Sequence, residues 1–329
     1  MTAAGYAGLS NLLMDGAIVV YTAAILAYAA EMLTARIVPA PAAKERVLVG
    51  TPGAQDTERA DPAPQESDAE APTGPGARSE FLGRVAVVVT VLGWLTHLAE
   101  ILTRGLAVHR WPWGNMYEFT STLCFAAVTA LLFLLWRYKA RFLGMYVLGV
   151  VVLGLGLDGA VLYESAGPLV PALRSYWIAI HVTAATLAIG LFTVATVVSA
   201  LYLVAERYRQ RVDAGVEVGL SGIAHRLPTP RALDALAYRV IAVGFPIWTF
   251  AVVAGAIWAE AAWGRYWGWD PKETWSFIIW VIYAGYLHAR VTAGWRGRRA
   301  AVIALVAFAA ILVNYFVVNI WIVGFHSYA

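Results

Sequence analysis

Eight apolar stretches that are poor in charged residues restrict what this chain can fold into. A helix that crosses the roughly 30 Å of membrane hydrocarbon needs about 20 mostly apolar residues. The chain has 329 residues, of which 60% are hydrophobic and 14% charged, so it has room for eight such helices. We therefore expect an all-α fold, a polytopic integral membrane protein with about eight transmembrane helices. The expected spans lie near residues 17–33, 81–102, 116–136, 142–162, 176–205, 240–259, 275–289 and 300–324.

The lysine and arginine residues predict the orientation of these spans, because basic residues accumulate in cytoplasmic loops. If the first helix starts outside, the inner segments carry nineteen basic residues and the outer loops carry five. No Lys or Arg precedes the first span, so this helix lacks the basic region of a cleaved signal peptide. We expect a retained first helix and both termini on the outer side.

Composition divides the chain into three regions. Residues 1–38 hold the first transmembrane helix and residues 80–329 hold the other seven spans. Between them, residues 39–79 are rich in Pro, Ala, Gly and acidic residues and cannot bury enough apolar surface to order the chain, so we expect a disordered cytoplasmic linker. The net charge of +3 is too small to indicate nucleic-acid binding. Cys124 is the one cysteine, which excludes a dithiol site within the chain.

The most informative segment is the loop at residues 263–275, which the predicted topology places on the outer side. Asp270, Pro271 and Glu273 have the spacing of a helix start, with an N-cap, a proline in the first turn and a capping box. The loop also carries four tryptophans, Trp263, Trp267, Trp269 and Trp275. They can form an aromatic belt at the membrane interface. If the loop is helical, they can instead wall a platform for a flat apolar ring system, with glycines along the other edge.

Residues 263–290, WGRYWGWDPKETWSFIIWVIYAGYLHAR, resemble the tryptophan-rich "WWD" signature of haem-handling membrane proteins. The form WDPKETW is similar to the CcsA/ResC branch of system II cytochrome c biogenesis, which is sometimes called CcsB in actinobacteria. Trp113–Glu118 also resembles the P-x-N-x-Y-E element that precedes an early span in this family, with Pro112 three residues before Asn115. The similarity therefore extends over most of the chain.

This resemblance implies a haem-handling subunit of the system II cytochrome c synthase. Such a subunit moves haem b to the outer face and presents it to apocytochrome c C-x-x-C-H sites for thioether attachment. It works in a holocytochrome c synthase complex with a ResB/CcsB-type membrane partner that has a large outer domain. The location is the bacterial plasma membrane, or the thylakoid membrane if the chain comes from a plastid. Because Cys124 is the one cysteine, other, thiol-reducing proteins must keep the apocytochrome thiols reduced.

Haem iron takes axial imidazole ligands, and the predicted topology sorts the histidines by depth. His181 lies just inside the outer end of the fifth span and His326 just beyond the outer end of the eighth, so both share the depth of the tryptophan-rich loop. The resemblance implies that they ligate haem at an outer site. It also implies that His288, in the seventh span, ligates haem at an intramembrane site, although His288 can also snorkel to the cytoplasmic surface. We expect its second ligand to come from the partner.

Three other candidates have less support. His97 has Glu100 three residues later on the same helical face, which favours a buried hydrogen-bonded pair over a haem ligand. Arg265 and Lys272 flank the platform and can face haem propionates or lipid phosphates.

The alternative function is a bis-histidine membrane cytochrome for electron transfer, which needs two depth-matched histidine pairs. Only His97 and His288 lie well inside spans, and their depths differ.

Overall fold

The computed structural model describes residues 2–34, 76–167, 173–216 and 223–326, and its regular structure in these ranges is all helical, with no strand. The all-α prediction is therefore confirmed for this part of the chain. The linker predicted at residues 39–79 lies outside the described residues except at its C-terminal end, where α2 begins.

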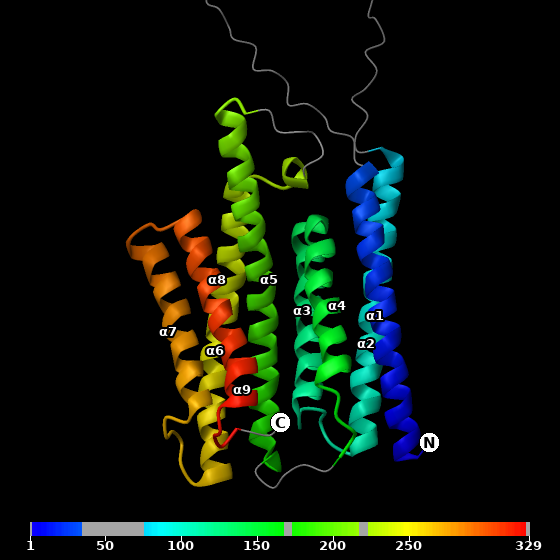
Figure 1. The fold of residues 1–329 in the computed structure, drawn as a ribbon, viewed down its shortest axis with the longest axis vertical. Coiled ribbons are helices and arrows are strands. Elements are labelled where there is room, and N and C mark those ends of the chain that lie inside the picture. The colour runs from blue at the N-terminus through cyan, green and yellow to red at the C-terminus, as the bar shows by residue number, and fades with distance from the viewer. Residues whose placement is uncertain (1, 35–75, 168–172, 217–222, 327–329) are drawn as a thin grey trace, which may run out of the picture.

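Seven of the described helices are long and apolar enough to cross a membrane. They are α1 (Ala3–Thr34), α2 (Ala77–Val108), α3 (Met116–Tyr138), α4 with its preceding turn (Arg141–Val161), α5 (Tyr176–Asp213), α6 (Pro230–Trp263) and the segment from α8 to α9 (Arg298–Trp321). The eighth expected span is α7 (Pro271–Thr292), whose Trp, Tyr and His side chains make it less apolar. It packs beside α6 and α8 in the bundle (Figure 1). The chain is a polytopic integral membrane protein, as predicted.

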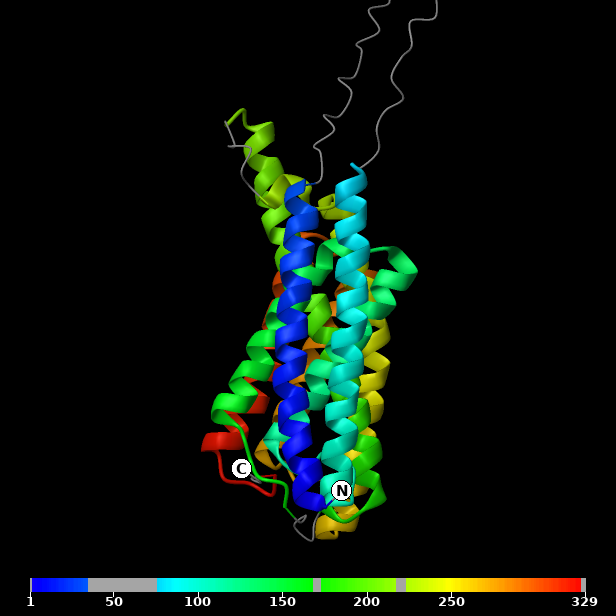
Figure 2. The same cartoon turned by 90° about the vertical axis from the view of Figure 1, so that its right-hand side faces the viewer.

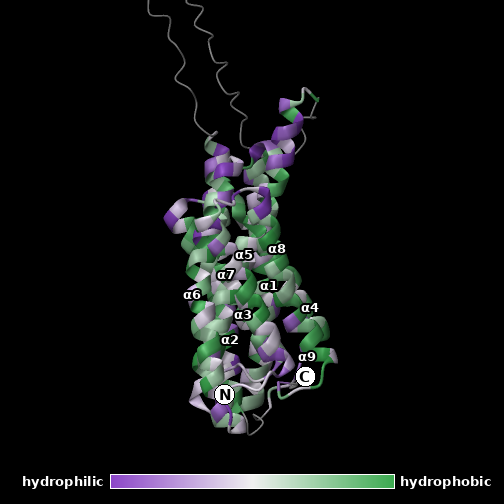
Figure 3. Ribbon diagram, turned by 90° about the vertical axis from the view of Figure 1, so that its left-hand side faces the viewer, coloured by the Kyte–Doolittle hydropathy of each residue, from purple (hydrophilic) through white to green (hydrophobic). Residues whose placement is uncertain are grey.

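The helices run up and down the long axis of the bundle, so the first and last described residues lie at the same end (Figure 1). Hydrophobic residues cover most of the length, and hydrophilic residues collect at the opposite end, around the C-terminal turns of α5 (Figure 3). That end holds the loops predicted to be cytoplasmic. The location of both termini on the outer side stays a prediction.

Close helix packing depends on small residues. Helices α1 and α2 run side by side (Figure 2), and a Cβ atom at Gly93 of α2 would lie 2.6 Å from the Tyr21 ring of α1. Helix α5 meets the backbone of α3 itself, because a Cβ atom at Gly190 would lie 2.8 Å from the backbone of Ala126. Small residues at such contacts are typical of membrane helix pairs, where dispersion contacts drive packing.

Side-chain caps begin three helices at the end of the bundle that holds both termini. Asn115 caps α3, Ser175 caps α5 and Asp270 caps α7, each with a side-chain oxygen that accepts a backbone N–H. At the same end α8 (Arg298–Leu312) passes through the π-helical segment Val313–Val317 before α9 (Val318–Trp321). π-helical turns often occur at functional sites.

Candidate functional site

A cavity of about 160 Å³ lies at this end of the bundle, between the first turns of α3, α5 and α7, the C-terminal half of α6, and the segment from the π-helical turn to the C-terminal tail. Its aromatic lining includes Trp113, Trp248, Trp258, Trp267 and Tyr315. Its polar lining includes His181, Lys272, Glu273, Asn314, Asn319 and His326. An apolar cavity with a few convergent polar groups is the usual form of a small-molecule site.

His181, on the second turn of α5, lines the cavity. Its Nδ1 lies 2.8 Å from the backbone oxygen of Ala251 on α6, so Nδ1 carries the proton and Nε2 has the lone pair. Gly255 makes this approach possible, because a Cβ atom there would lie 2.7 Å from the imidazole. The ring of Trp258 lies nearly parallel to the imidazole, with ring centroids 6.0 Å apart. Histidines that bind metals usually have the other ring nitrogen held in this way.

His326 lines the same cavity from the C-terminal tail. Its Nδ1 lies 2.9 Å from Oδ2 of Asp270, and the backbone N–H of Phe325 donates to Oδ1 of Asp270 at 2.8 Å. Burial lowers the pKa of His326 more than the hydrogen bond to Asp270 raises it, so the ring is held neutral. Both histidines therefore present Nε2 as the lone-pair nitrogen. The structure brings the two predicted outer ligands to one cavity.

Asp270 has two structural connections. It is the N-cap of α7, and its capping box is complete, because Oε2 of Glu273 accepts the backbone N–H of Asp270 at 3.0 Å. The predicted helix start is therefore confirmed. Burial raises the pKa of Asp270, but the hydrogen bonds from His326, Phe325 and Lys272 outweigh burial and lower the pKa to about 2. The carboxylate thus ties the tail that carries His326 to the start of α7.

The helical arrangement considered for the tryptophan-rich loop is wrong. Helix α6 ends at Trp263, because Gly264 takes a left-handed conformation with φ of 71°. The loop from there to Asp270 is not helical, and Trp269 also has a positive φ, of 57°. The tryptophans and glycines therefore do not form two edges of one helix.

The four predicted platform tryptophans have different positions. Trp267 lines the cavity. Trp263 packs against His326, with ring centroids 4.8 Å apart. Trp269 is 64% exposed and touches Trp267 edge-on, and Trp275 lies on α7, packed against the core. Only Trp267 of the four is a wall of the cavity.

Sequence reasoning missed three tryptophan walls of the cavity. Trp248 and Trp258 lie on α6, upstream of the tryptophan-rich loop, and Trp113 lies before α3. Trp258 contacts both candidate ligands, since its ring centroid lies 5.4 Å from that of His326 and 6.0 Å from that of His181. The sequence did contain a signal for Trp258. It lies five residues before Trp263, which places it near the same end of the membrane.

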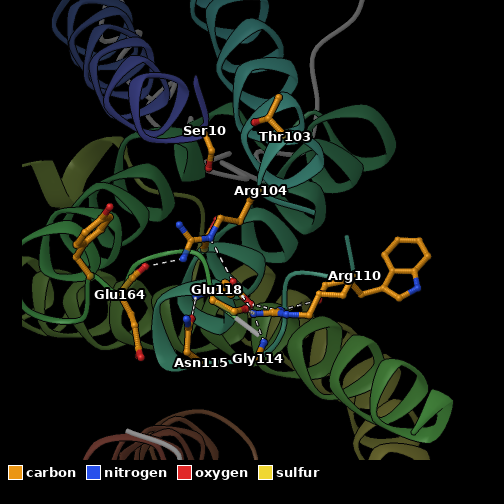
Figure 4. A network of polar contacts seen from close by, with 12 residues as sticks. Ser10, Thr103, Arg104, Arg110, Gly114, Asn115, Glu118 and Glu164 are labelled. Atoms are coloured by element: carbon orange, nitrogen blue, oxygen red, sulfur yellow. Dashed lines mark hydrogen bonds and ion pairs between the residues drawn. The ribbon is translucent and has the colours of Figure 1, made fainter. Parts of the chain in front are cut away.

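A buried ion-pair network fixes the segment that contains Trp113 (Figure 4). The carboxylate of Glu118 accepts from Arg104 at 3.2 Å, from Arg110 at 2.6 Å and from the backbone N–H of Gly114 at 2.7 Å. Asn115 in turn accepts the Glu118 N–H at 2.8 Å. The element that resembles P-x-N-x-Y-E is therefore one rigid corner of the cavity.

The structure does not bring the other two candidate histidines, His288 and His97, to the cavity. His288 is exposed on α7. His97 is fully buried on α2, with Nδ1 3.3 Å from the Tyr21 hydroxyl and Nε2 3.1 Å from Ser121. Ser121 also donates to Glu100 at 2.7 Å, so His97 and Glu100 are linked through Ser121 and not directly. Helices α2 and α7 lie on opposite sides of the bundle (Figure 1).

The two basic candidates also separate. Lys272 lines the cavity, and its ammonium group donates to Oδ1 of Asn319 on α9. Arg265 lies 3.7 Å from the carboxylate of Glu273 and over the ring of Phe325, and it is not a lining residue.

Comparison with known proteins connects this cavity to a family. The family profile described as "Cytochrome C assembly protein" matches residues 113–326, which contain every cavity-lining residue named above. The chain belongs to this family. The protein described as "Cytochrome c biogenesis protein CcsA" from Parasynechococcus marenigrum (strain WH8102) is 37% identical over 261 residues, which cover 71% of this chain and 85% of the relative. CcsA from Porphyra purpurea is 32% identical over 287 residues, which cover 76% of this chain and 89% of the relative.

A solved structure shares the fold. The chain described as "Cytochrome c Heme Lyase CcmF" superposes with a TM-score of 0.61 at 17% sequence identity, over 96% of this chain and 47% of that one. The present chain thus spans about half the length of that protein. The family and the CcsA relatives support a role in cytochrome c maturation, for a multi-pass protein of the plasma or thylakoid membrane.

Proposed function

We propose that this protein binds haem b at the outer end of the bundle and presents it to apocytochrome c for covalent attachment. The observation that carries the proposal is that His181 and His326 line one cavity, each with Nδ1 held by an oxygen acceptor. Two neutral imidazoles suit an iron whose remaining ligands come from a porphyrin. No group of three His, Cys, Asp or Glu side chains that could hold a bare metal ion occurs among the described residues.

The aromatic walls suit the same substrate. Trp258 and Trp267 offer flat apolar surfaces for a porphyrin ring, and Trp263 packs against the His326 imidazole.

In the proposed reaction each thiol of a C-x-x-C-H site adds across one haem vinyl group. The sulfur bonds to one vinyl carbon, and the thiol hydrogen ends on the other. The addition needs no oxidant or reductant, and the bond-forming thiols belong to the apocytochrome, while this chain supplies orientation and the axial ligands.

Substitution of the two histidines tests this proposal. We expect His181→Ala and His326→Ala each to abolish holocytochrome c formation and the two-imidazole, low-spin spectrum of the purified protein with haem. Added imidazole should restore part of both signals by filling the vacant axial position. His225→Ala, at the opposite end of the bundle, is the matched control and should leave both signals unchanged. Full activity and an unchanged spectrum in both single variants would contradict the proposal.

The exposed position of His288 supports a second part of the proposal. We infer that His288 holds haem on its way outward, and that the second axial ligand comes from a transmembrane helix of a ResB/CcsB-type partner. The other intramembrane histidine, His97, is on α2, which lies on the opposite side of the bundle from α7 (Figure 1). Co-expression with that partner should therefore raise the haem content and give a low-spin signal that His288→Ala removes. If the chain alone already binds haem fully at this site, and His97→Ala removes the signal, the partner is not needed.

A further inference from the structure

Lys272 is a half-buried cation in the wall of the cavity. It is the one Lys or Arg among the described lining residues, and the described part of the chain gives its ammonium group no ion pair. Its hydrogen-bond partner is the neutral amide oxygen of Asn319. The two carboxylates on its own turn have other partners. Asp270 accepts from the Phe325 backbone N–H and the His326 side chain, and Glu273 accepts from the backbone N–H groups of Gly268 and Asp270.

An ammonium group has three N–H donors, and an apolar wall makes an unmatched charge costly. Asn319 accepts one of these N–H donors with its amide oxygen and has two N–H donors of its own. The pair therefore needs further hydrogen-bond acceptors beside it. A carboxylate oxygen is the acceptor that best satisfies both groups, because charge-assisted hydrogen bonds are the stronger ones. The neighbouring Arg265 is not an alternative, since it does not line the cavity and its guanidinium group lies over the Phe325 ring.

We propose that Lys272 and Asn319 form a carboxylate subsite that binds the propionate edge of haem and so fixes the direction of the ring in the cavity. This inference rests on the proposed function, because it needs haem as the occupant. The propionates and the vinyl groups of haem b occupy opposite edges of the ring. Lys272 lies in the first turn of α7, whereas Trp113, Asn115 and Met116 line the cavity from the start of α3. In the bundle α5 lies between α7 and α3 (Figure 1).

The vinyl edge therefore faces the α3 side of the cavity. This places the incoming apocytochrome thiols near the segment from Trp111 to Asn115. Trp111 is 68% exposed there and stacks on Trp113 with ring centroids 5.4 Å apart. The network around Glu118 fixes this corner (Figure 4), so the vinyl groups would meet a rigid surface that a peptide can approach.

A binding comparison between haem and haem dimethyl ester tests the subsite, because the ester has the same ring and iron but no carboxylates. The full-length protein in detergent is titrated with each compound, and the low-spin band reports binding. We expect the natural protein to prefer haem by about tenfold or more, which is the scale of one hydrogen bond to a charged group. Lys272→Met should remove most of this preference while keeping the low-spin band. Lys272→Arg should keep part of it.

Two controls separate the alternatives. Arg174→Gln removes a positive charge at the same end of the bundle from an exposed side chain and should keep the full preference. Asn319→Ala leaves Lys272 in place and should weaken the preference, which gives a second test if Lys272→Met does not accumulate. A preference as large in Lys272→Met as in the natural protein, with a low-spin band that still needs His181, would overturn the subsite and leave the proposed function intact. A band that does not need His181 or His326 would overturn the proposed function itself.

Discussion

Replacing Asp270 with asparagine asks whether this carboxylate only caps α7 or also holds His326 in its ligating form. In the structure Oδ1 accepts the Phe325 N–H at 2.8 Å, and Oδ2 accepts Nδ1–H of His326 at 2.9 Å and the Lys272 N–H at 3.3 Å. Asparagine has one oxygen and one N–H₂ group, so it can replace only one of these two acceptors.

Either orientation of the new amide damages the site. If the nitrogen replaces Oδ2, His326 keeps its hydrogen bond only by moving its proton to Nε2, the nitrogen that must bind iron. If the nitrogen replaces Oδ1, the Phe325 N–H loses its acceptor, and the tail that carries His326 loses an anchor. A lost hydrogen bond to a charged group costs about 1.5–3 kcal/mol, which lowers the population of the ligating arrangement by a factor of about 10 to 150.

The assay is the visible spectrum of the purified protein during titration with haem. We expect Asp270→Asn to bind haem at least about tenfold more weakly and to lose low-spin character, with partial recovery in imidazole. Asp270→Ala also loses an N-cap worth about 0.5–2 kcal/mol, so its membrane level should fall as well. Thr229→Ala removes the side-chain cap of α6 far from the cavity and controls for capping alone. A wild-type affinity and spectrum in Asp270→Asn would show that Asp270 is only a helix cap.

Two further predictions follow from the packing and a third from the distribution of lysine and arginine. Gly255→Ala places a Cβ atom 2.7 Å from the His181 imidazole, so the low-spin spectrum should be lost at normal protein levels. As a control, the Cβ atom of Gly159→Ala meets nothing within 4 Å, so that variant should keep the spectrum. Glu118→Gln weakens a buried ion-pair network, and because breaking such a pair costs about 3–5 kcal/mol, thermal unfolding in detergent should shift to a clearly lower Tm. An unchanged Tm would show that the network adds no stability. A reporter enzyme active only in the cytoplasm, fused after Ala329, should be silent. Strong activity there would mean an odd number of spans or an inverted orientation.

The local features of this protein follow from its sequence because they depend on residues close together in the chain. The length and apolarity of each span are such features, and so is the helix start at Asp270, Pro271 and Glu273, where each hydrogen bond of the capping box joins residues two or three apart. The shared depth of His181 and His326 also follows, since it needs only the order of the spans. The structure places both at one cavity, and their role as haem ligands stays a prediction.

Only the tertiary structure decides which side chains meet. The acceptor for His181 is a backbone oxygen 70 residues away, and the acceptor for His326 lies 56 residues away. Neither pairing leaves a pattern within one segment. The space that Gly255 leaves for an imidazole, and the separation of Lys272 from Arg265, likewise depend on how α5, α6, α7 and α9 pack. The tryptophan-rich loop also could not be predicted from its local pattern. The spacing of its tryptophans and glycines suits a helix, but the left-handed turn at Gly264 ends α6. The loop that follows leads to Asp270, which holds the tail that carries His326.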